Sequence, residues 1–241
     1  MNSIYSSPET LARIALMLGI YHRLPFAAEG VIPGIIVENV LAQARGMKRL
    51  GKYDFVDVLS KEDRVGLQVK SSKAGSPLTW QRAKVDRATE KRQASKEFPE
   101  AAQVLGAEIL DYINRHMLKD LDAHDIDEIG YARLVVTKSE AFYFETKLID
   151  RANPILFDPK KFTWEWAMDR KASKEQRGSL SAYDNKDVKW FSWHTENQLH
   201  FNNEKVWWPK PGDPHRVDFS LRGEKIDPMA LKKWLDSQDG A

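Results

Sequence analysis

The fold is decided by two β-rich segments that a short polar stretch connects. They read Tyr53-Asp54-Phe55-Val56-Asp57-Val58-Leu59 and Val65-Gly66-Leu67-Gln68-Val69-Lys70-Ser71-Ser72. Apolar and β-branched residues dominate both, which predicts two strands paired as a hairpin. Side chains alternate between the two faces of a strand, and residues opposite each other on paired strands lie roughly 4.5 to 5.5 Å apart. The hairpin can therefore gather carboxylate, amide and ammonium groups that are distant in the sequence.

The register of this hairpin depends on the loop within Ser60-Lys61-Glu62-Asp63-Arg64. A loop of three or five residues would place Asp54, Gln68 and Lys70 on one face, whereas a two-residue loop would turn Asp57 toward that face. Two-residue hairpin turns favour Asn-Gly or Asp-Gly, and the central pair here would be Lys61-Glu62. We therefore expect the longer loop and Asp54, with Asp57 as the alternative.

An acidic residue that opens one strand, followed by Gln-x-Lys in the next, resembles the PD-(D/E)XK nuclease superfamily in its glutamine variant. The similarity covers mainly residues 33 to 92 and is greatest to the type II restriction endonucleases. It implies an α/β fold with a central mixed β-sheet flanked by helices. It also implies Mg²⁺-dependent cleavage of both strands of double-stranded DNA by a homodimer, since a twofold dimer suits a palindromic site.

The same resemblance assigns roles to individual residues. Asp54 and Gln68 would ligate Mg²⁺, because hard cations accept both carboxylate and amide oxygens. Lys70 would orient or deprotonate the attacking water and stabilise charge on the phosphoryl oxygens. Glu38 would add a third ligand from a helix that the apolar spacing predicts over residues 34–44. Because Gln68 stands where relatives carry an acid, the cage has one negative charge fewer and is expected to bind metal more weakly.

Two basic segments are candidates for DNA contact. Net charge is only +2, so a nucleic-acid surface has to come from local clustering. Lys73, Arg82 and Lys84 follow the catalytic strand and would hold phosphates, with a helix expected to begin at Thr79. Lys174, Gln176 and Arg177 lie in a polar stretch and have side chains able to pair with base edges. The alternative for each is an ordinary solvated or salt-bridged surface residue.

The remaining pattern predicts one domain over 1–241, with a helical N-terminus and catalytic core in 1–150. Helices are expected over 11–20, capped by Ser7, and over 99–119. Paired strands are expected over 131–137 and 141–149. Residues 151–241 carry seven of the eight tryptophans and predict a β-rich elaboration that supplies DNA recognition, although a packing role for the tryptophans is the favoured alternative.

Composition narrows the function further. The chain has no cysteine, which excludes disulfides, thiolate catalysis and cysteine-ligated zinc and is compatible with a cytoplasmic location. No nucleotide-binding or serine-hydrolase motif is present, and no apolar run approaches the roughly 18 residues of a membrane span. We therefore expect no nucleotide cofactor and no membrane partner. A Holliday-junction resolvase, a repair nickase and a non-catalytic DNA-binding protein remain the alternatives.

Overall fold

A computed structural model describes residues 4–51, 54–167 and 178–230 of the chain. It is an α/β structure with a mixed six-stranded sheet, a second antiparallel sheet and flanking helices, as the sequence predicts. The chain divides into two compact units. The first comprises residues 1–76, 126–148 and 209–241, and the second comprises residues 77–125 and 149–208.

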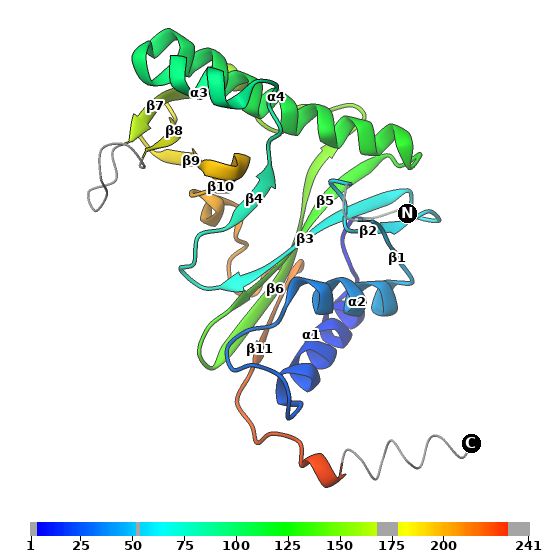
Figure 1. Ribbon diagram of the computed structural model, residues 1–241. Coiled ribbons are helices and arrows are strands. Elements are labelled where there is room, and N and C mark those ends of the chain that lie inside the picture. Colours follow the sequence, from blue (N-terminus) through cyan, green and yellow to red (C-terminus); the bar gives the residue numbers. More distant parts are fainter. Residues whose placement is uncertain (1–3, 52–53, 168–177, 231–241) are drawn as a thin grey trace. The chain divides into compact units, whose positions relative to one another are not determined.

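The first unit contains the mixed sheet and two helices (Figure 1). Its sheet has the order β1-β2-β3-β5-β6-β11. The elements are α1 (Pro8–Arg23), α2 (Gly34–Arg45), β1 (Lys48–Arg49), β2 (Val58–Ser60), β3 (Val65–Lys73), β5 (Glu128–Val136), β6 (Glu140–Asp150) and β11 (Arg216–Ser220). Strand β3 runs antiparallel to β2 and parallel to β5. The central position of β5 explains why eight consecutive residues from Ile129 onward are buried, since a strand covered on both faces is apolar throughout.

Local signals set the helices of this unit. Ser7 caps α1 by accepting a hydrogen bond from the backbone N–H of Thr10 at 3.2 Å, as predicted. Helix α2 ends at Gly46, whose φ of 67° and ψ of 22° place it in the left-handed region that glycine enters without steric cost. Helix α1 packs on α2 and on β11, while α2 packs on β2 and β3. These contacts fix α2 beside the hairpin.

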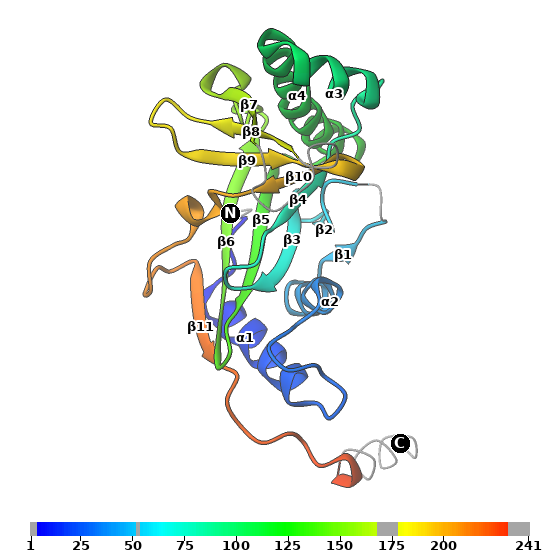
Figure 2. The same ribbon diagram turned by 60° about the vertical axis from the view of Figure 1, so that its left-hand side comes forward.

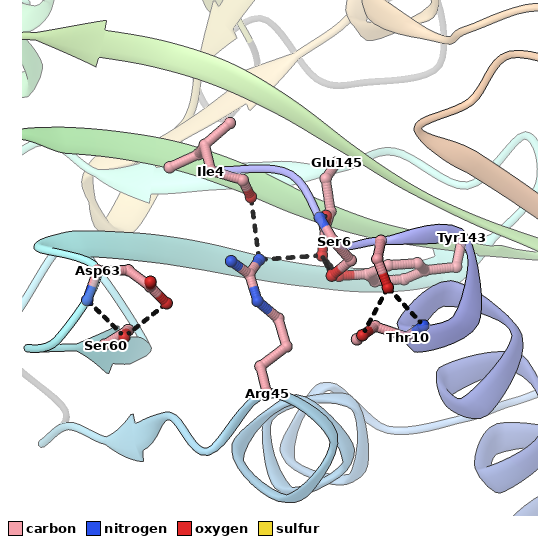
Figure 3. A network of polar contacts seen from close by, with 9 residues as sticks. Ile4, Ser6, Thr10, Arg45, Ser60, Asp63, Tyr143 and Glu145 are labelled. Carbon is pink, nitrogen blue, oxygen red and sulfur yellow. Dashed lines mark hydrogen bonds and ion pairs between the residues drawn. The ribbon is translucent and has the colours of Figure 1, made fainter. Parts of the chain in front are cut away.

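A buried polar network secures the C-terminal end of α2 (Figure 3). The side chain of Arg45 lies 3.3 Å from a carboxylate oxygen of Glu145 and donates to the carbonyl of Ile4 at 2.9 Å. Glu145 also accepts from the backbone N–H of Ser6 at 2.6 Å, from the Ser6 hydroxyl at 2.8 Å and from Tyr143 at 2.8 Å. A buried carboxylate is tolerated when a cation and several donors surround it. The network therefore joins α2, β6 and the segment before α1.

The second unit contains the antiparallel sheet, in the order β4-β10-β9-β8-β7 (Figure 2). Its elements are β4 (Thr79–Arg82), α3 (Ala88–Glu97), α4 (Pro99–Ala123), η1 (Pro159–Lys161), β7 (Thr163–Ala167), β8 (Ser179–Tyr183), β9 (Lys189–Trp193), η2 (Thr195–Asn197), β10 (Gln198–Phe201) and η3 (Glu204–Trp207). Helices α3 and α4 pack together, and α4 lies against β7 and β8. The tryptophan-rich segment thus forms β-structure, as predicted.

The helix expected to begin at Thr79 is wrong. Residues 79–82 form β4, in which Gln81 pairs with Leu199 of β10 and Trp80 is fully buried. Trp80 packs edge-on against Phe157, Phe201 and Trp207 with ring centroids 5.4 to 6.4 Å apart. Burial of one large aromatic side chain outweighs a weak helical preference over so short a segment. The helix begins instead at Ala88.

Other expectations are confirmed, several with longer bounds. Helix α4 continues to Ala123, and β5 and β6 are neighbours in the sheet. The prediction of one domain with a boundary at residue 150 stays a prediction; the segment after 150 contributes residues 151–208 to the second unit and residues 209–241 to the first. Within the described part of the chain, no helix combines the length and the apolar character needed to cross a membrane.

Candidate active site

The hairpin that carries the predicted catalytic residues has an even-numbered loop. Ser60 pairs with Val65, which leaves the four residues from Lys61 to Arg64 as the connection. The expected loop of three or five residues is therefore wrong. An even loop has the same parity as a two-residue loop, so it turns Asp57, the alternative, toward the face of Gln68 and Lys70.

Asp57 lies one residue before β2, at the end of the ladder. The last pair is Val58 with Leu67, and the backbone N–H of Asp57 still donates to the Leu67 carbonyl at 2.9 Å. Its carboxylate accepts a hydrogen bond from the backbone N–H of Val69 at 2.6 Å. Val69 is the residue between Gln68 and Lys70, so the carboxylate reaches β3 at the level of these two side chains.

Asp54, the preferred ligand from the sequence, does not belong to a strand. The strand expected from residue 53 begins only at Val58, and Asp54 lies in a bend before it. The reason for the difference is that residues 54–57 do not continue the regular pairing with β3, although Phe55 and Val56 are buried. Burial of apolar residues in an irregular segment gives the same sequence pattern as a strand.

Gln68 and Lys70 lie on β3, two residues apart and therefore on one face. Gln68 is 1% exposed. On the neighbouring parallel strand β5, Lys70 pairs in register with Arg133. The guanidinium of Arg133 is buried and donates to the Ser72 hydroxyl at 2.8 Å and to the carbonyl of Leu134. The central strands thus place Arg133 beside Lys70, which in turn acts on the Asp57 carboxylate.

Electrostatics show how closely these groups interact. Burial raises the pKa of Asp57 to about 6, and Glu38 acts in the same direction, while Lys70, the Val69 N–H and Arg49 oppose the shift. Burial also lowers the pKa of Lys70, against the opposing effects of Asp57 and Glu38, and Arg133 lowers it further. A carboxyl and an amine with pKa values shifted toward each other are typical of sites that exchange protons near neutral pH.

Glu38 of α2 acts electrostatically on both Asp57 and Lys70, and its role as a metal ligand stays a prediction. One of its carboxylate oxygens lies 3.1 Å from a guanidinium nitrogen of Arg49 on β1, and Arg49 also donates to the side chain of Asn39 at 3.1 Å. Glu38 and Arg45 are separated by seven residues, close to two helical turns, and so share one face of α2. The buried Arg45–Glu145 ion pair therefore fixes the orientation of the α2 face on which Glu38 lies.

The oxygen atoms of these groups are of the types that bind hard divalent cations. Glu38 and Asp57 offer carboxylate oxygens and Gln68 offers an amide oxygen, which are the ligand types that Mg²⁺ accepts. The raised pKa of Asp57 shows that its negative charge is incompletely compensated by Lys70 and Arg49, and a cation would supply the missing compensation. The sequence did not single out Arg49 or Arg133. Arg133 could have been found as the one charged residue in the apolar run Tyr131-Ala132-Arg133-Leu134-Val135-Val136.

The predicted DNA contacts are distributed over both units. Lys73 is exposed at the end of β3 in the first unit. Arg82 and Lys84 are exposed at the end of β4 in the second unit, and Arg82 lies 3.8 Å from Glu196. The second segment, with Lys174, Gln176 and Arg177, lies outside the described residues. No family model, curated protein or solved structure matches this chain.

Proposed function

We propose that the protein is a Mg²⁺-dependent endonuclease that hydrolyses both strands of double-stranded DNA, in the manner of a type II restriction endonuclease. The observation that carries the proposal is the approach of the Asp57 carboxylate to β3 between Gln68 and Lys70. The electrostatic effect of Glu38 of α2 on both Asp57 and Lys70 supports it. The metal role assigned from the sequence to Asp54 passes to Asp57 in this proposal.

Each side chain has a separate task in the proposed reaction. Glu38, Asp57 and Gln68 would hold Mg²⁺, which supplies Lewis-acid polarisation of the phosphoryl group when bound. Lys70 orients the attacking water and accepts or shares its proton, because burial lowers the pKa of its ammonium toward the range useful for general-base work. Arg133 sets the charge environment of Lys70 through its in-register position on β5.

Partners and location follow from the same proposal. Lys73, Arg82 and Lys84 are exposed cations suited to phosphate contact. A homodimer would allow each protomer to cut one strand of a palindromic site. The absence of cysteine from the sequence is compatible with the cytoplasm, where such an enzyme would meet DNA.

Incubation of the purified protein with unmethylated phage DNA, in Mg²⁺ or in EDTA, tests the proposal by electrophoresis. Discrete fragments that require Mg²⁺ are expected. Lys70→Ala and the volume-conserving Lys70→Met should both abolish cleavage while leaving DNA binding in a mobility-shift assay. Lys61→Ala removes an exposed lysine of the hairpin loop and is the matched control. Cleavage by Lys70→Met at the wild-type rate would refute the site.

A parallel comparison of Asp54→Ala with Asp57→Ala separates the two candidate ligands. We expect Asp57→Ala to lose Mg²⁺-dependent cleavage and Asp54→Ala to retain it, since the hairpin directs Asp57 to β3. Loss of activity in Asp54→Ala alone, with intact folding by circular dichroism, would return the metal role to Asp54. Cutting of branched DNA without cutting of linear DNA would instead indicate a junction resolvase.

A further inference from the structure

The second unit contains a cavity of about 750 Å³ that lies entirely among its own residues. It is lined by the segment from Leu156 to Thr163, the turn after β8, Trp190 of β9 and Trp207 of η3. Specific small-molecule pockets typically measure about 300–1,000 Å³ and combine apolar walls with a few polar groups. The volume of this cavity lies within that range, and its lining combines aromatic rings with polar and charged side chains.

Aromatic rings form its floor and walls. Phe157 is buried and stacks with Trp207, with ring centroids 5.7 Å apart and planes 6° from parallel. Phe162 meets Trp190 edge-on at 5.7 Å. Phe162, Trp190 and Trp207 are each partly exposed, so part of their surface is accessible to a ligand. Flat apolar walls of this kind suit a planar ring that can stack.

One wall is fixed in orientation by a carboxylate. Asp184 accepts a hydrogen bond from the indole N–H of Trp190 at 2.9 Å. Its second oxygen accepts from the backbone N–H groups of Lys186 and Val188, at 2.9 and 3.0 Å, which closes the turn before β9. The Trp190 ring is therefore held in place before any ligand arrives, which lowers the entropic cost of binding.

Exposed polar side chains that line the cavity indicate which polar groups a ligand would carry. Thr163 and Asn185 are exposed lining residues that offer a hydroxyl and an amide. Lys160 and Lys161 are exposed on η1, whose first turn Asp158 caps by accepting the Lys160 backbone N–H at 3.0 Å. A ligand with an aromatic face, a hydrogen-bonding edge and an adjoining anion would use all of these groups.

We propose that this cavity binds an unstacked nucleobase of a DNA strand, with Lys160 and Lys161 contacting its neighbouring phosphate. The base stacks on Trp190, whose ring Asp184 holds in place, and presents its edge to Thr163 and Asn185. Two lysines and two aspartates line the cavity, but Asp158 and Asp184 already accept hydrogen bonds from the Lys160 N–H and the Trp190 indole, whereas Lys160 and Lys161 are exposed and able to contact an anion. The test below distinguishes a base with its phosphate from a quaternary ammonium, the other common guest of aromatic walls. The proposal deepens the proposed function, on which its biological meaning rests, but binding alone tests it.

The test measures the anisotropy of a labelled single-stranded 12-mer, with the cleavage-deficient Lys70→Ala protein as background and EDTA present. Trp190→Ala should weaken binding roughly 5- to 150-fold, the range measured for loss of one base–aromatic stack. Trp190→Phe should restore most of the affinity, because it keeps a ring. If circular dichroism shows that Trp190→Ala is unfolded, the lysine variants described next and the fluorescence measurement provide the test.

The double variant Lys160→Ala/Lys161→Ala should weaken binding and reduce the magnitude of the salt slope by about 0.7, the contribution of one neutralised phosphate on a single strand. Lys186→Ala removes an exposed lysine of the adjacent turn that does not line the cavity, and it should bind as the background protein does. Quenching of tryptophan fluorescence by deoxynucleoside monophosphates, absent in Trp190→Phe/Trp207→Phe, would support base binding directly.

Unchanged DNA affinity in both the tryptophan and the lysine variants would overturn the proposal. Preferential binding of tetramethylammonium over nucleotides would overturn it as well. Either result, obtained together with Mg²⁺-dependent cleavage by the wild-type protein, leaves the proposed nuclease function standing. If the wild-type protein binds bases but cleaves no DNA, the base-binding proposal stands and the proposed nuclease function fails.

Discussion

Replacing Asp57 with Asn should stabilise the metal-free protein while removing its proposed activity. Burial raises the pKa of this carboxyl from 3.8 to about 6. An acid with a raised folded-state pKa binds more protons in the native than in the unfolded state between these two values, so wild-type stability falls as pH rises through this window. Asn stays neutral, and its carbonyl oxygen can still accept the Val69 N–H.

The expected gain can be worked out at each pH. One pKa unit corresponds to about 1.4 kcal/mol, so ionised Asp57 destabilises the native state by about 3 kcal/mol at pH 8. The same linkage gives between about 1 and 2 kcal/mol at pH 5 and less than about 1 kcal/mol at pH 4. Asp57 opposes the lowering of the Lys70 pKa by burial, so Asp57→Asn lets the Lys70 pKa fall further. The measurements at pH 4 and 5, where Lys70 is most fully protonated in both proteins, are therefore the least affected by Lys70.

Urea denaturation in EDTA at pH 4, 5 and 8, followed by circular dichroism, measures this difference. Glu62→Gln is the matched control, because it neutralises an exposed carboxylate in the loop of the same hairpin, and it should change stability by less than about 0.5 kcal/mol. A gain for Asp57→Asn that is absent at pH 8, or equal at pH 4 and pH 8, would refute the burial of an incompletely compensated carboxylate at this position.

Three further outcomes are expected from stability measurements. Glu145→Ala should cost about 3–5 kcal/mol, because it leaves the buried Arg45 guanidinium without its carboxylate; a loss below about 1 kcal/mol in urea denaturation would contradict this. Tyr143→Phe removes one donor to the same carboxylate and should cost about 1–2 kcal/mol by the same assay, with unchanged stability as the contrary result. Gly106→Ala should destabilise by about 1–3 kcal/mol despite alanine's better helix propensity, since the new Cβ would lie 2.2 Å from the ring of Trp164; a raised thermal midpoint would show that the ring can move.

The sequence was sufficient for the sheet class and for most helices because these depend on local patterns. Ser7 and Pro8 mark the start of α1, and the apolar spacing from Gly34 onward predicts α2. The alternating and continuous apolar runs around Tyr131 and Phe144 predict β5 and β6. Such signals act within a few residues, so a single sequence contains them.

The sequence alone does not decide which aspartate, Asp54 or Asp57, shares a face with Gln68 and Lys70. The answer depends on whether the hairpin loop has an odd or an even number of residues, and the composition of Lys61-Glu62-Asp63-Arg64 does not distinguish a three-residue loop from a four-residue loop. Strand β4 was not predicted because the position of Trp80 depends on ring contacts with Phe157 and Trp207, which are distant in the sequence. The proximity of Arg133 to Lys70 likewise required knowledge of which strand lies beside β3.

The first unit is assembled from three separated stretches of chain, and this has a consequence for its synthesis on the ribosome. Strand β3 is complete by Lys73, but its parallel neighbour begins only at Glu128. At translation rates of about 5–20 residues per second, the nascent hairpin waits roughly 3–12 s for that partner. During this interval one edge of β3 has unpaired backbone groups and can associate with other chains. Slowed elongation between residues 73 and 128 should therefore lower the yield of correctly folded protein in cells.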